Sequence, residues 1–211
     1  MADITICCIK WGTKYGPEYV NKLYAMVRRN VLCVPHDFVC FTEDPTGIDP
    51  EIRIAPLPCV HPAWWQKVGL FQERIPGVDT AKIFFIDLDM VIVSEIDAML
   101  EYDSDFTIMR NWPPEMHGDD NSYMTAAFLL KVGAQPNAWR FFEPRVMREY
   151  PSDQEWITAS APGADLFPYD WTPSYKLRRL QDHIPPEAKI VAFHGLPRPH
   201  QCGGWVKEYW K

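Results

Sequence analysis

Two carboxylates interrupt an apolar run in the middle of the sequence. Asp87 and Asp89 follow the apolar residues 83–86, and the apolar pattern resumes at residues 90–93. A carboxylate is costly to bury unless a cation or a hydrogen-bond donor pairs with it. Residues two apart on an extended chain point the same way, so we expect both side chains on one side and Leu88 on the other. Oxygen pairs suit Mg²⁺ or Mn²⁺, which predicts a metal site at the end of a central strand.

A second candidate group follows the last apolar run. His194 comes directly after residues 190–193, and the glycine and prolines that follow it predict a rigid loop. An imidazole is a good third ligand for Mn²⁺ beside two carboxylates, and the guanidinium of Arg198 matches phosphate oxygens. The alternative is an ordinary turn in which His194 bonds a neighbouring carbonyl group.

Hydrophobic spacing predicts the elements that must position these residues. Strand, helix and strand alternate in the first half, which predicts an α/β domain with a largely parallel sheet. In such sheets ligands bind beyond the carboxyl ends of the strands, where Asp87 and Asp89 would lie. Beside the strand that carries these aspartates, the expected strands are 4–9, 36–41, 105–110, 126–132 and 190–193, and the expected helices are 17–30, 64–74, 137–149 and 153–160.

Length and composition narrow the class of protein. The 211 residues, 47% hydrophobic and 23% charged, predict one soluble globular domain. The net charge of −7 argues against a nucleic-acid partner. The N-terminus has no signal-peptide pattern and no segment has the length of a membrane span, so we expect a cytoplasmic protein. The six cysteines form no CxxC pair, which favours buried, reduced thiols over a zinc site.

Together, the two motifs resemble those of glycosyltransferases of the GT-A fold, in particular the retaining enzymes of glycosyltransferase family eight and their short bacterial relatives. In that family a strand of the form hhhhDxD supplies two metal ligands, and a late HxxGxxKPW-type loop supplies a histidine ligand. The segment FFIDLDMVIV, residues 84–93, matches the first motif. The segment FHGLPRPH, residues 193–200, is similar to a shortened second one, with Arg198 in place of the lysine.

The resemblance implies a fold and a division of the chain. The fold is an α/β, Rossmann-like nucleotide-binding GT-A fold with a mostly parallel central sheet flanked by helices. Residues 1–211 would form one such domain. Within it, residues 1–97 would be the nucleotide-binding half, and residues 98–211 would hold the sugar, the acceptor and the metal-ligand loop.

The resemblance also implies an activity. A hexose would move from a nucleotide sugar to a glycan, lipid-linked or protein acceptor with retention of configuration. The nucleotide sugar that the resemblance implies is a UDP-sugar. Mn²⁺ or Mg²⁺ would be held by Asp87, Asp89 and His194. The catalytic residues would be Lys67 with Asp153 and Gln154, which resemble the family's DQ motif. Nucleotide contacts would come from Trp11, Gly12, Tyr15, Thr42, Lys67, Asp87, Leu88 and Arg198.

Three alternatives remain open at this point. Thr125-Ala126-Ala127 departs from the family's Asn-containing stretch, which also allows a sugar-nucleotide-binding protein without turnover. A haloacid-dehalogenase-like phosphatase also has a DxD after an apolar strand, and Gly118-Asp119-Asp120 resembles its later acidic motif, although its nucleophile normally follows the first strand. Read singly, a lysine such as Lys67 on an amphipathic helix is more often a solvated charge than a ligand, and Asp153 fits a helix N-cap equally well.

The last segment, residues 205–211, combines aromatic and basic side chains. We expect it to form a helix that docks on the domain. The alternative is peripheral contact with the inner face of a membrane, where lipid-linked acceptors reside.

Overall fold

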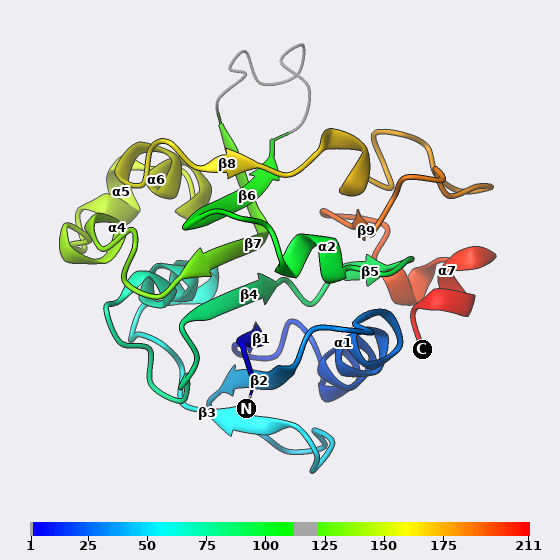
Figure 1. The fold of residues 1–211 in the computed structure, drawn as a ribbon, viewed down its shortest axis with the longest axis horizontal. Helices are drawn as coiled ribbons and strands as arrows, with labels where there is room; N and C mark the ends of the chain where they lie inside the picture. The colour runs from blue at the N-terminus through cyan, green and yellow to red at the C-terminus, as the bar shows by residue number, and fades with distance from the viewer. Residues whose placement is uncertain (1, 112–121) are drawn as a thin grey trace.

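The structure is a computed structural model that describes residues 2–111 and 122–211 (Figure 1). Within these residues, seven strands form one sheet in the order β3-β2-β1-β4-β7-β6-β8, and β5 pairs with β9 in a small second sheet. The strands are β1 Ile4–Lys10, β2 His36–Thr42, β3 Arg53–Ala55, β4 Lys82–Ile86, β5 Met90–Ile92, β6 Phe106–Arg110, β7 Tyr123–Lys131, β8 Asp165–Leu166 and β9 Ile190–Ala192.

The main sheet is mixed but mostly parallel. β1 runs parallel to β2 and β4, β2 runs parallel to β3, and β8 runs parallel to β6. β7 runs antiparallel to both of its neighbours, β4 and β6. Four of the six neighbouring pairs in the described part of this sheet are therefore parallel. The predicted α/β class with a mostly parallel central sheet is confirmed.

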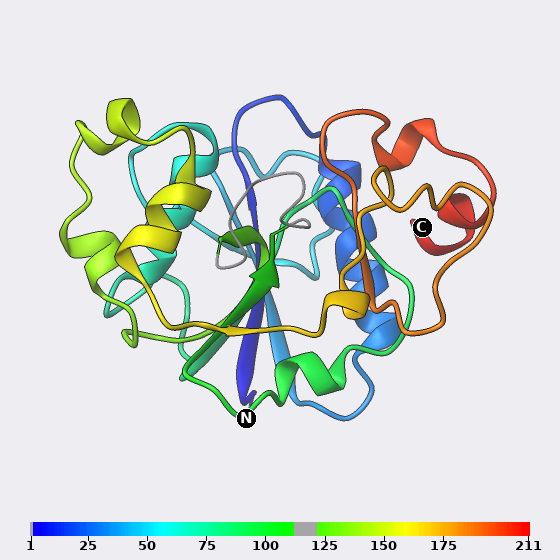
Figure 2. The ribbon, with the colours of Figure 1, turned by 90° about the horizontal axis from the view of Figure 1, so that it is seen from above.

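Helices cover both faces of the sheet (Figures 1 and 2). One face carries α1, α2 and α7, and the other carries the 3₁₀ helix η1 with α4, α5 and α6. The bounds are α1 Pro17–Asn30, α2 Asp97–Leu100, α4 Asn137–Arg140, α5 Val146–Glu149, α6 Asp153–Ser160 and α7 Trp205–Tyr209, with η1 at Ala63–Phe71, η2 at Tyr169–Trp171 and η3 at Pro199–Gln201.

Side-chain alternation along the strands builds the two cores. In β1, Ile4, Ile6 and Cys8 pack toward α1, whereas Cys7 packs toward the face that η1 covers. All three residues from Ile6 to Cys8 have no exposed surface, because helices cover both sides of the strand. The cysteines are free thiols, and Cys7, Cys8, Cys40 and Cys202 are buried while Cys33 is exposed.

The chain leaves the sheet at the two aspartates. β4 ends at Ile86, and the N–H of Met90 donates to the carbonyl oxygen of Asp87 at 3.3 Å, so residues 87–89 form a turn. The expected extended conformation of residues 87–89 is therefore wrong, although both carboxylates line one pocket. The physical reason is that β7 pairs with β4 only as far as Ile86, after which the chain turns away to pair with β9.

Two predicted helices also differ from the structure. The segment expected as a helix at 64–74 is the shorter 3₁₀ helix η1. The segment expected as one helix at 137–149 is divided into α4 and α5, because Pro144 has no N–H to continue the hydrogen-bond ladder. The predicted helices 17–30 and 153–160 have the predicted bounds. The N-cap of α6 is Ser152, whose hydroxyl accepts from the N–H of Gln154 at 3.2 Å.

The C-terminal segment docks on α1. Trp210 is 7% exposed, and the ammonium of Lys22 lies 4.2 Å from the centre of its ring. Arg29 donates to the carbonyl oxygen of Tyr209 at 2.8 Å, and Trp205 donates to that of Leu180 at 2.7 Å. The aromatic side chains of this segment are thus engaged within the domain. In the described residues, no helix is long and apolar enough to cross a membrane.

Candidate active site

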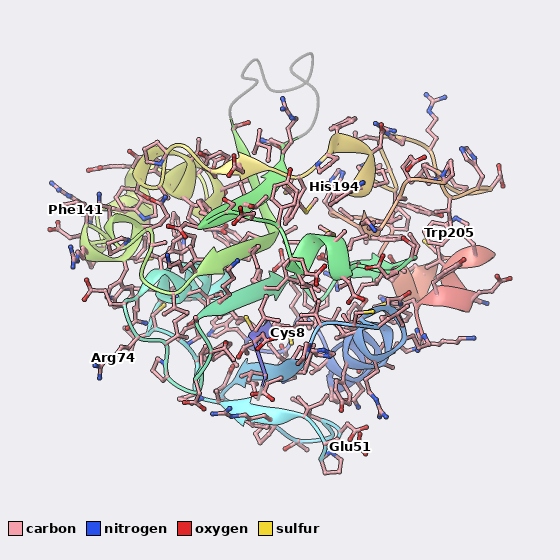
Figure 3. All side chains as sticks on the ribbon, in the orientation of Figure 1. Cys8, Glu51, Arg74, Phe141, His194 and Trp205 are labelled. Atoms are coloured by element: carbon pink, nitrogen blue, oxygen red, sulfur yellow. The ribbon has the colours of Figure 1, made fainter. Side chains whose placement is uncertain are left out.

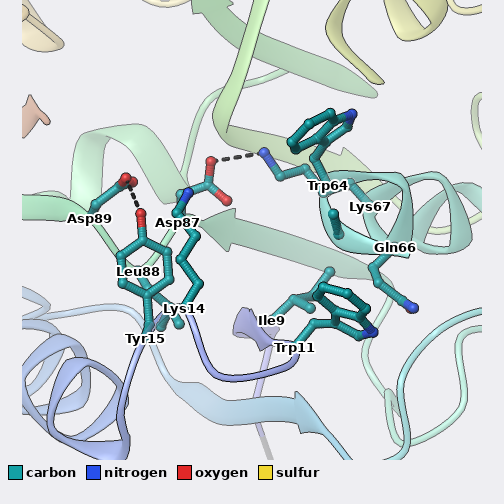
Figure 4. Close-up of a pocket in the computed structure, with 11 residues that line it drawn as sticks. Ile9, Trp11, Lys14, Tyr15, Trp64, Gln66, Lys67, Asp87, Leu88 and Asp89 are labelled. Atoms are coloured by element: carbon teal, nitrogen blue, oxygen red, sulfur yellow. Dashed lines mark hydrogen bonds and ion pairs between the residues drawn. The ribbon is translucent and has the colours of Figure 1, made fainter. Parts of the chain in front are cut away.

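A pocket lies where β1 and β4 end, at the carboxyl edge of the parallel part of the sheet (Figure 4). Its volume is about 190 Å³. The turn after β4, the loop after β1 and the start of η1 supply its walls, so three elements that are distant in sequence meet there. The lining residues are Ile9, Trp11, Lys14, Tyr15, Ala63, Trp64, Gln66, Lys67, Asp87, Leu88 and Asp89.

Lys67 links two of the predicted site carboxylates. Its Nζ lies 2.8 Å from Oδ2 of Asp87 and 3.6 Å from Oδ2 of Asp153. The hydroxyl of Thr125 donates to the same Asp153 oxygen at 2.7 Å and lies 3.4 Å from Nζ. Thr125, Asp153 and Lys67 are 2%, 3% and 8% exposed. The four residues form one network in which Asp87 is partly exposed and the other three are buried, which rules out the reading of Lys67 as a solvated surface charge.

Negative charge exceeds positive charge in this network. Burial raises the pKa of Asp87 to about 7, with the attraction of Lys67 opposing that rise and the repulsion of Asp89 adding to it. Burial likewise raises the pKa of Asp153. Burial lowers the pKa of Lys67, but Asp153 and Asp87 outweigh it and hold the pKa above its ordinary value, so the lysine is protonated. Three carboxyl groups lie around one ammonium, and a bound cation would favour their ionised forms.

Tyr15 holds the second carboxylate of the turn. Its hydroxyl donates to Oδ2 of Asp89 at 2.5 Å, as Figure 4 shows. Burial and the neighbouring Asp89 raise the pKa of Tyr15, so its hydroxyl keeps the proton that it donates. The guanidinium carbon of Arg198 lies 5.2 Å from the centre of the Tyr15 ring, and Arg198 donates to the carbonyl oxygen of Lys14 at 3.4 Å. The late loop therefore reaches the edge of the pocket through Arg198.

The backbone just before His194 lies next to the aspartate turn in space. The N–H of Phe193 donates to the carbonyl oxygen of Asp89 at 3.2 Å, which continues the β5–β9 pairing. The imidazole Nε2 lies 2.8 Å from the hydroxyl of Ser174. Figure 3 shows His194 on the α7 side of the molecule, far from Phe141.

The two aspartates have part of what a metal site requires. Asp87 and Asp89 line one pocket and offer the hard oxygen ligands that Mn²⁺ and Mg²⁺ prefer, next to uncompensated negative charge. Their chemistry fits such an ion. Among residues 2–111 and 122–211, however, no three His, Cys, Asp or Glu side chains are grouped to hold a metal. The structure brings the two aspartates together and does not add His194 to them as a third ligand.

The other predicted residues have different surroundings. The N–H of Gly12 donates to Oε1 of Glu43 at 2.6 Å, and the hydroxyl of Thr42 bonds within its own turn to Asp44. Leu88 is 2% exposed and belongs to the core beside α1 while it lines the pocket. Gln154 lies in the first turn of α6, directly after Asp153. The phosphatase motif at 118–120 lies outside the described residues.

Sequence reasoning missed several lining residues. Lys14, Ala63, Trp64 and Gln66 belong to the pocket and were not assigned to a site. The adjacent pair Trp64-Trp65 was a signal for Trp64. Two adjacent side chains of a helix do not face the same way, so when one indole packs in the core the other points elsewhere. Thr125 was noted only as a departure from a family pattern, and its contact with Asp153 depends on long-range pairing that the sequence does not display.

Comparison with known proteins identifies the fold. The galactosyltransferase LgtC, solved in complex with donor and acceptor sugar analogues, aligns with a TM-score of 0.64 and 12% identity over 97% of this chain and 93% of its own. The glycosyltransferase GlyE of Streptococcus pneumoniae aligns with a TM-score of 0.69 and 10% identity over 100% and 60%. The bifunctional glycosyltransferase WbbM gives 0.63 and 10% over 94% and 47%.

These structures share the GT-A fold with this chain, so the predicted glycosyltransferase fold is confirmed. The chain spans about nine tenths of LgtC but only 60% of GlyE and 47% of WbbM. No protein-family model matches the sequence, and no curated protein sequence matches it significantly. At identities of 10% to 12%, the likeness defines the architecture, and the activity must be argued from the site.

Proposed function

We propose that this protein is a metal-dependent glycosyltransferase that moves a hexose from a nucleotide sugar, in particular a UDP-sugar, to a glycan, lipid-linked or protein acceptor. The observation that carries the proposal is the pocket at the carboxyl ends of β1 and β4. There Asp87 and Asp89 lie together in a fold shared with solved glycosyltransferases, and Lys67 connects Asp87 to Asp153. Residues 1–97 would bind the nucleotide, and residues 98–211 the sugar and the acceptor.

The chemistry of such a transfer is stabilisation of the leaving diphosphate. A bound Mn²⁺ or Mg²⁺, held by Asp87 and Asp89, would supply positive charge to the departing phosphates. Tyr15 keeps the Asp89 carboxylate in place through its hydroxyl. Arg198, at the edge of the pocket, would add a bidentate contact to a phosphate. His194 serves as a ligand through Nε2 only if its contact with Ser174 opens.

The transferred sugar would lie near Asp153, at the opposite end of the network from Asp87. Positive charge that develops at the anomeric carbon is stabilised by a nearby carboxylate or amide oxygen, and Asp153 and Gln154 are the candidates. Thr125 and Lys67 fix one oxygen of Asp153. The family resemblance implies that the reaction retains anomeric configuration, and NMR spectroscopy of the product anomer would test this.

The direct test is release of UDP from a set of UDP-sugars, with and without Mn²⁺. We expect the wild-type protein to turn over at least one donor only when the metal is present. Asp89→Asn should abolish this turnover, because the amide cannot serve as a charged ligand. Asp105→Asn is the matched control, since Asp105 lies in an exposed ion pair with Lys131 outside the pocket.

Two outcomes would count against the proposal. Unchanged turnover in Asp89→Asn, or full turnover in excess chelator, would remove the metal from the mechanism. Binding of UDP-sugars without turnover would instead favour a sugar-nucleotide-binding protein. The phosphatase alternative has less support, because Asp87 follows β4 and the nucleophile of that family normally follows the first strand.

A further inference from the structure

Trp64 is an exposed aromatic residue in the wall of the pocket. Its side chain keeps 50% of its surface exposed, although it lines the pocket together with Lys67 and Asp87. Figure 4 shows its indole beside Lys67, while Trp11 lies beside Ile9 on the β1 side. An exposed apolar surface that faces a pocket favours binding of a ligand that covers it, because the ligand removes that surface from water.

The backbone before Trp64 is strained. Ala63 has a φ of +53°, in the left-handed region that residues with a Cβ rarely adopt. Such conformations persist where the surrounding structure requires them, and they concentrate at binding sites. Ala63 itself lines the pocket, so the strain lies at the wall and not in a remote turn.

Neighbouring residues anchor this wall. Trp65 is 5% exposed, and its ring centre lies 5.4 Å from that of the partly buried Phe142, which packs against the core. Gln66 is 1% exposed, donates to the carbonyl oxygen of His61 and accepts from the N–H of Cys59 at 3.3 Å. Because Trp65 and Gln66 are fixed in the interior, η1 presents Trp64 to the pocket with little freedom to turn away.

The position of Trp64 on η1 defines what it can meet. In a 3₁₀ helix, side chains three apart lie on the same face, so Trp64 lies over Lys67. Lys67 contacts Asp87, which lines the pocket, and Asp153, which lies buried behind the lysine and is the proposed partner of the reacting sugar. The aromatic residues proposed for the nucleotide, Trp11 and Tyr15, come instead from the loop after β1.

We propose that Trp64 is the stacking platform of an acceptor subsite and binds the apolar face of a pyranose ring. A pyranose has C–H groups on one face and hydroxyls at its edge, which matches an indole flanked by Lys67 and Asp87. The donor sugar would meet Asp153, which is 3% exposed, whereas the half-exposed Trp64 lies at the outer part of the site. The assignment of the ring to the acceptor rests on the proposed function.

The test compares Trp64→Ala and Trp64→Phe with the full-length wild-type chain. Saturation-transfer NMR spectroscopy measures binding of lactose, cellobiose and the methyl glycosides of common hexoses and hexosamines in the presence of UDP and Mn²⁺. Titration calorimetry measures binding of UDP. We expect Trp64→Ala to weaken binding of at least one of these sugars about tenfold, Trp64→Phe to restore most of it, and UDP affinity to stay within about twofold. Phe141→Ala, which removes another exposed aromatic ring outside the pocket, should change neither.

The outcomes separate this inference from the proposed function. Sugar binding that is lost in Trp64→Ala supports the platform even if no UDP-sugar is turned over. Loss of UDP affinity in Trp64→Ala as large as the loss of sugar affinity would make Trp64 a nucleotide contact and overturn the inference. Absence of saturation transfer to all these sugars in the wild-type chain would also overturn it. Where turnover is found, the KM for the acceptor should rise more in Trp64→Ala than in Trp64→Phe.

Discussion

Replacement of Lys67 by methionine would test the buried network through stability alone. Methionine keeps the length and apolar character of the lysine side chain but removes the ammonium that contacts both Asp87 and Asp153. Asp153 would then keep the hydrogen bond from Thr125 as its contact in an interior where its side chain is 5% exposed. Asp87 is less affected, because its side chain is 29% exposed and water can reach it.

The expected magnitude follows from this difference in burial. Removal of one partner of a buried ion pair typically destabilises a protein by about 3 to 5 kcal/mol, because the other charge stays buried without compensation. Since one of the two carboxylates here is partly solvated, we expect the lower end, about 3 kcal/mol. Arg28→Met is the matched control. Arg28 pairs with Glu51 at 2.9 Å, but both side chains are about 60% exposed, so the loss should be below about 1 kcal/mol.

Urea unfolding followed by circular dichroism gives both free energies, and their pH dependence gives a second check. Burial raises the pKa of Asp153, and loss of Lys67 would raise it further. The folded state of Lys67→Met therefore favours the protonated, neutral form of Asp153. A group with a raised folded-state pKa stabilises the fold at low pH and loses that contribution as pH rises. The deficit of Lys67→Met should therefore be smaller at about pH 5 than at about pH 8. Equal deficits in Lys67→Met and Arg28→Met would refute the reasoning.

Two further predictions concern packing. Gly69→Ala should destabilise the protein by about 1 to 3 kcal/mol in urea unfolding, because the added Cβ would lie 2.7 Å from the backbone of Pro58; unchanged stability would mean that η1 moves freely against that loop. Trp210→Ala should lower the free energy of unfolding by about 3 kcal/mol, and with it the melting temperature, since the ring is 7% exposed and packs on Tyr19 and Lys22. The affinity for UDP should persist. An unchanged melting temperature would show that the C-terminal segment is not docked in solution.

Local sequence patterns predicted the elements whose neighbours are close in the chain. The apolar spacing of residues 17–30 and the first-turn proline define α1, whereas the N-cap of α6 is Ser152 and not Asp153, the candidate from the sequence. Periodicity did not predict the division of 137–149, where Pro144 ends one helix before the next begins. The proline itself is the local signal for this division, because it cannot continue a helix.

The site was harder to predict because long-range pairing builds it. The N–H of Asp87 donates to the carbonyl oxygen of Ala126 at 2.8 Å, and this β4–β7 contact brings Thr125 to Lys67 and Asp153. No spacing in the sequence indicates that register. The turn at 87–89 has the same origin, since β5 continues into a second sheet with β9. The aspartates themselves were recognisable because charged residues within an apolar run need a partner.

The pairing of β5 with β9 has a consequence for synthesis. β4 and β5 leave the ribosome early, but β9, at residues 190–192, is made only near the end of the described chain. A nascent chain can therefore form the sheet from β1, β2 and β4 while the segment after Asp89 still lacks its hydrogen-bonding strand. The edge of β5 therefore stays open until β9 pairs with it. Capture of the exposed edge by another chain would be the characteristic folding error.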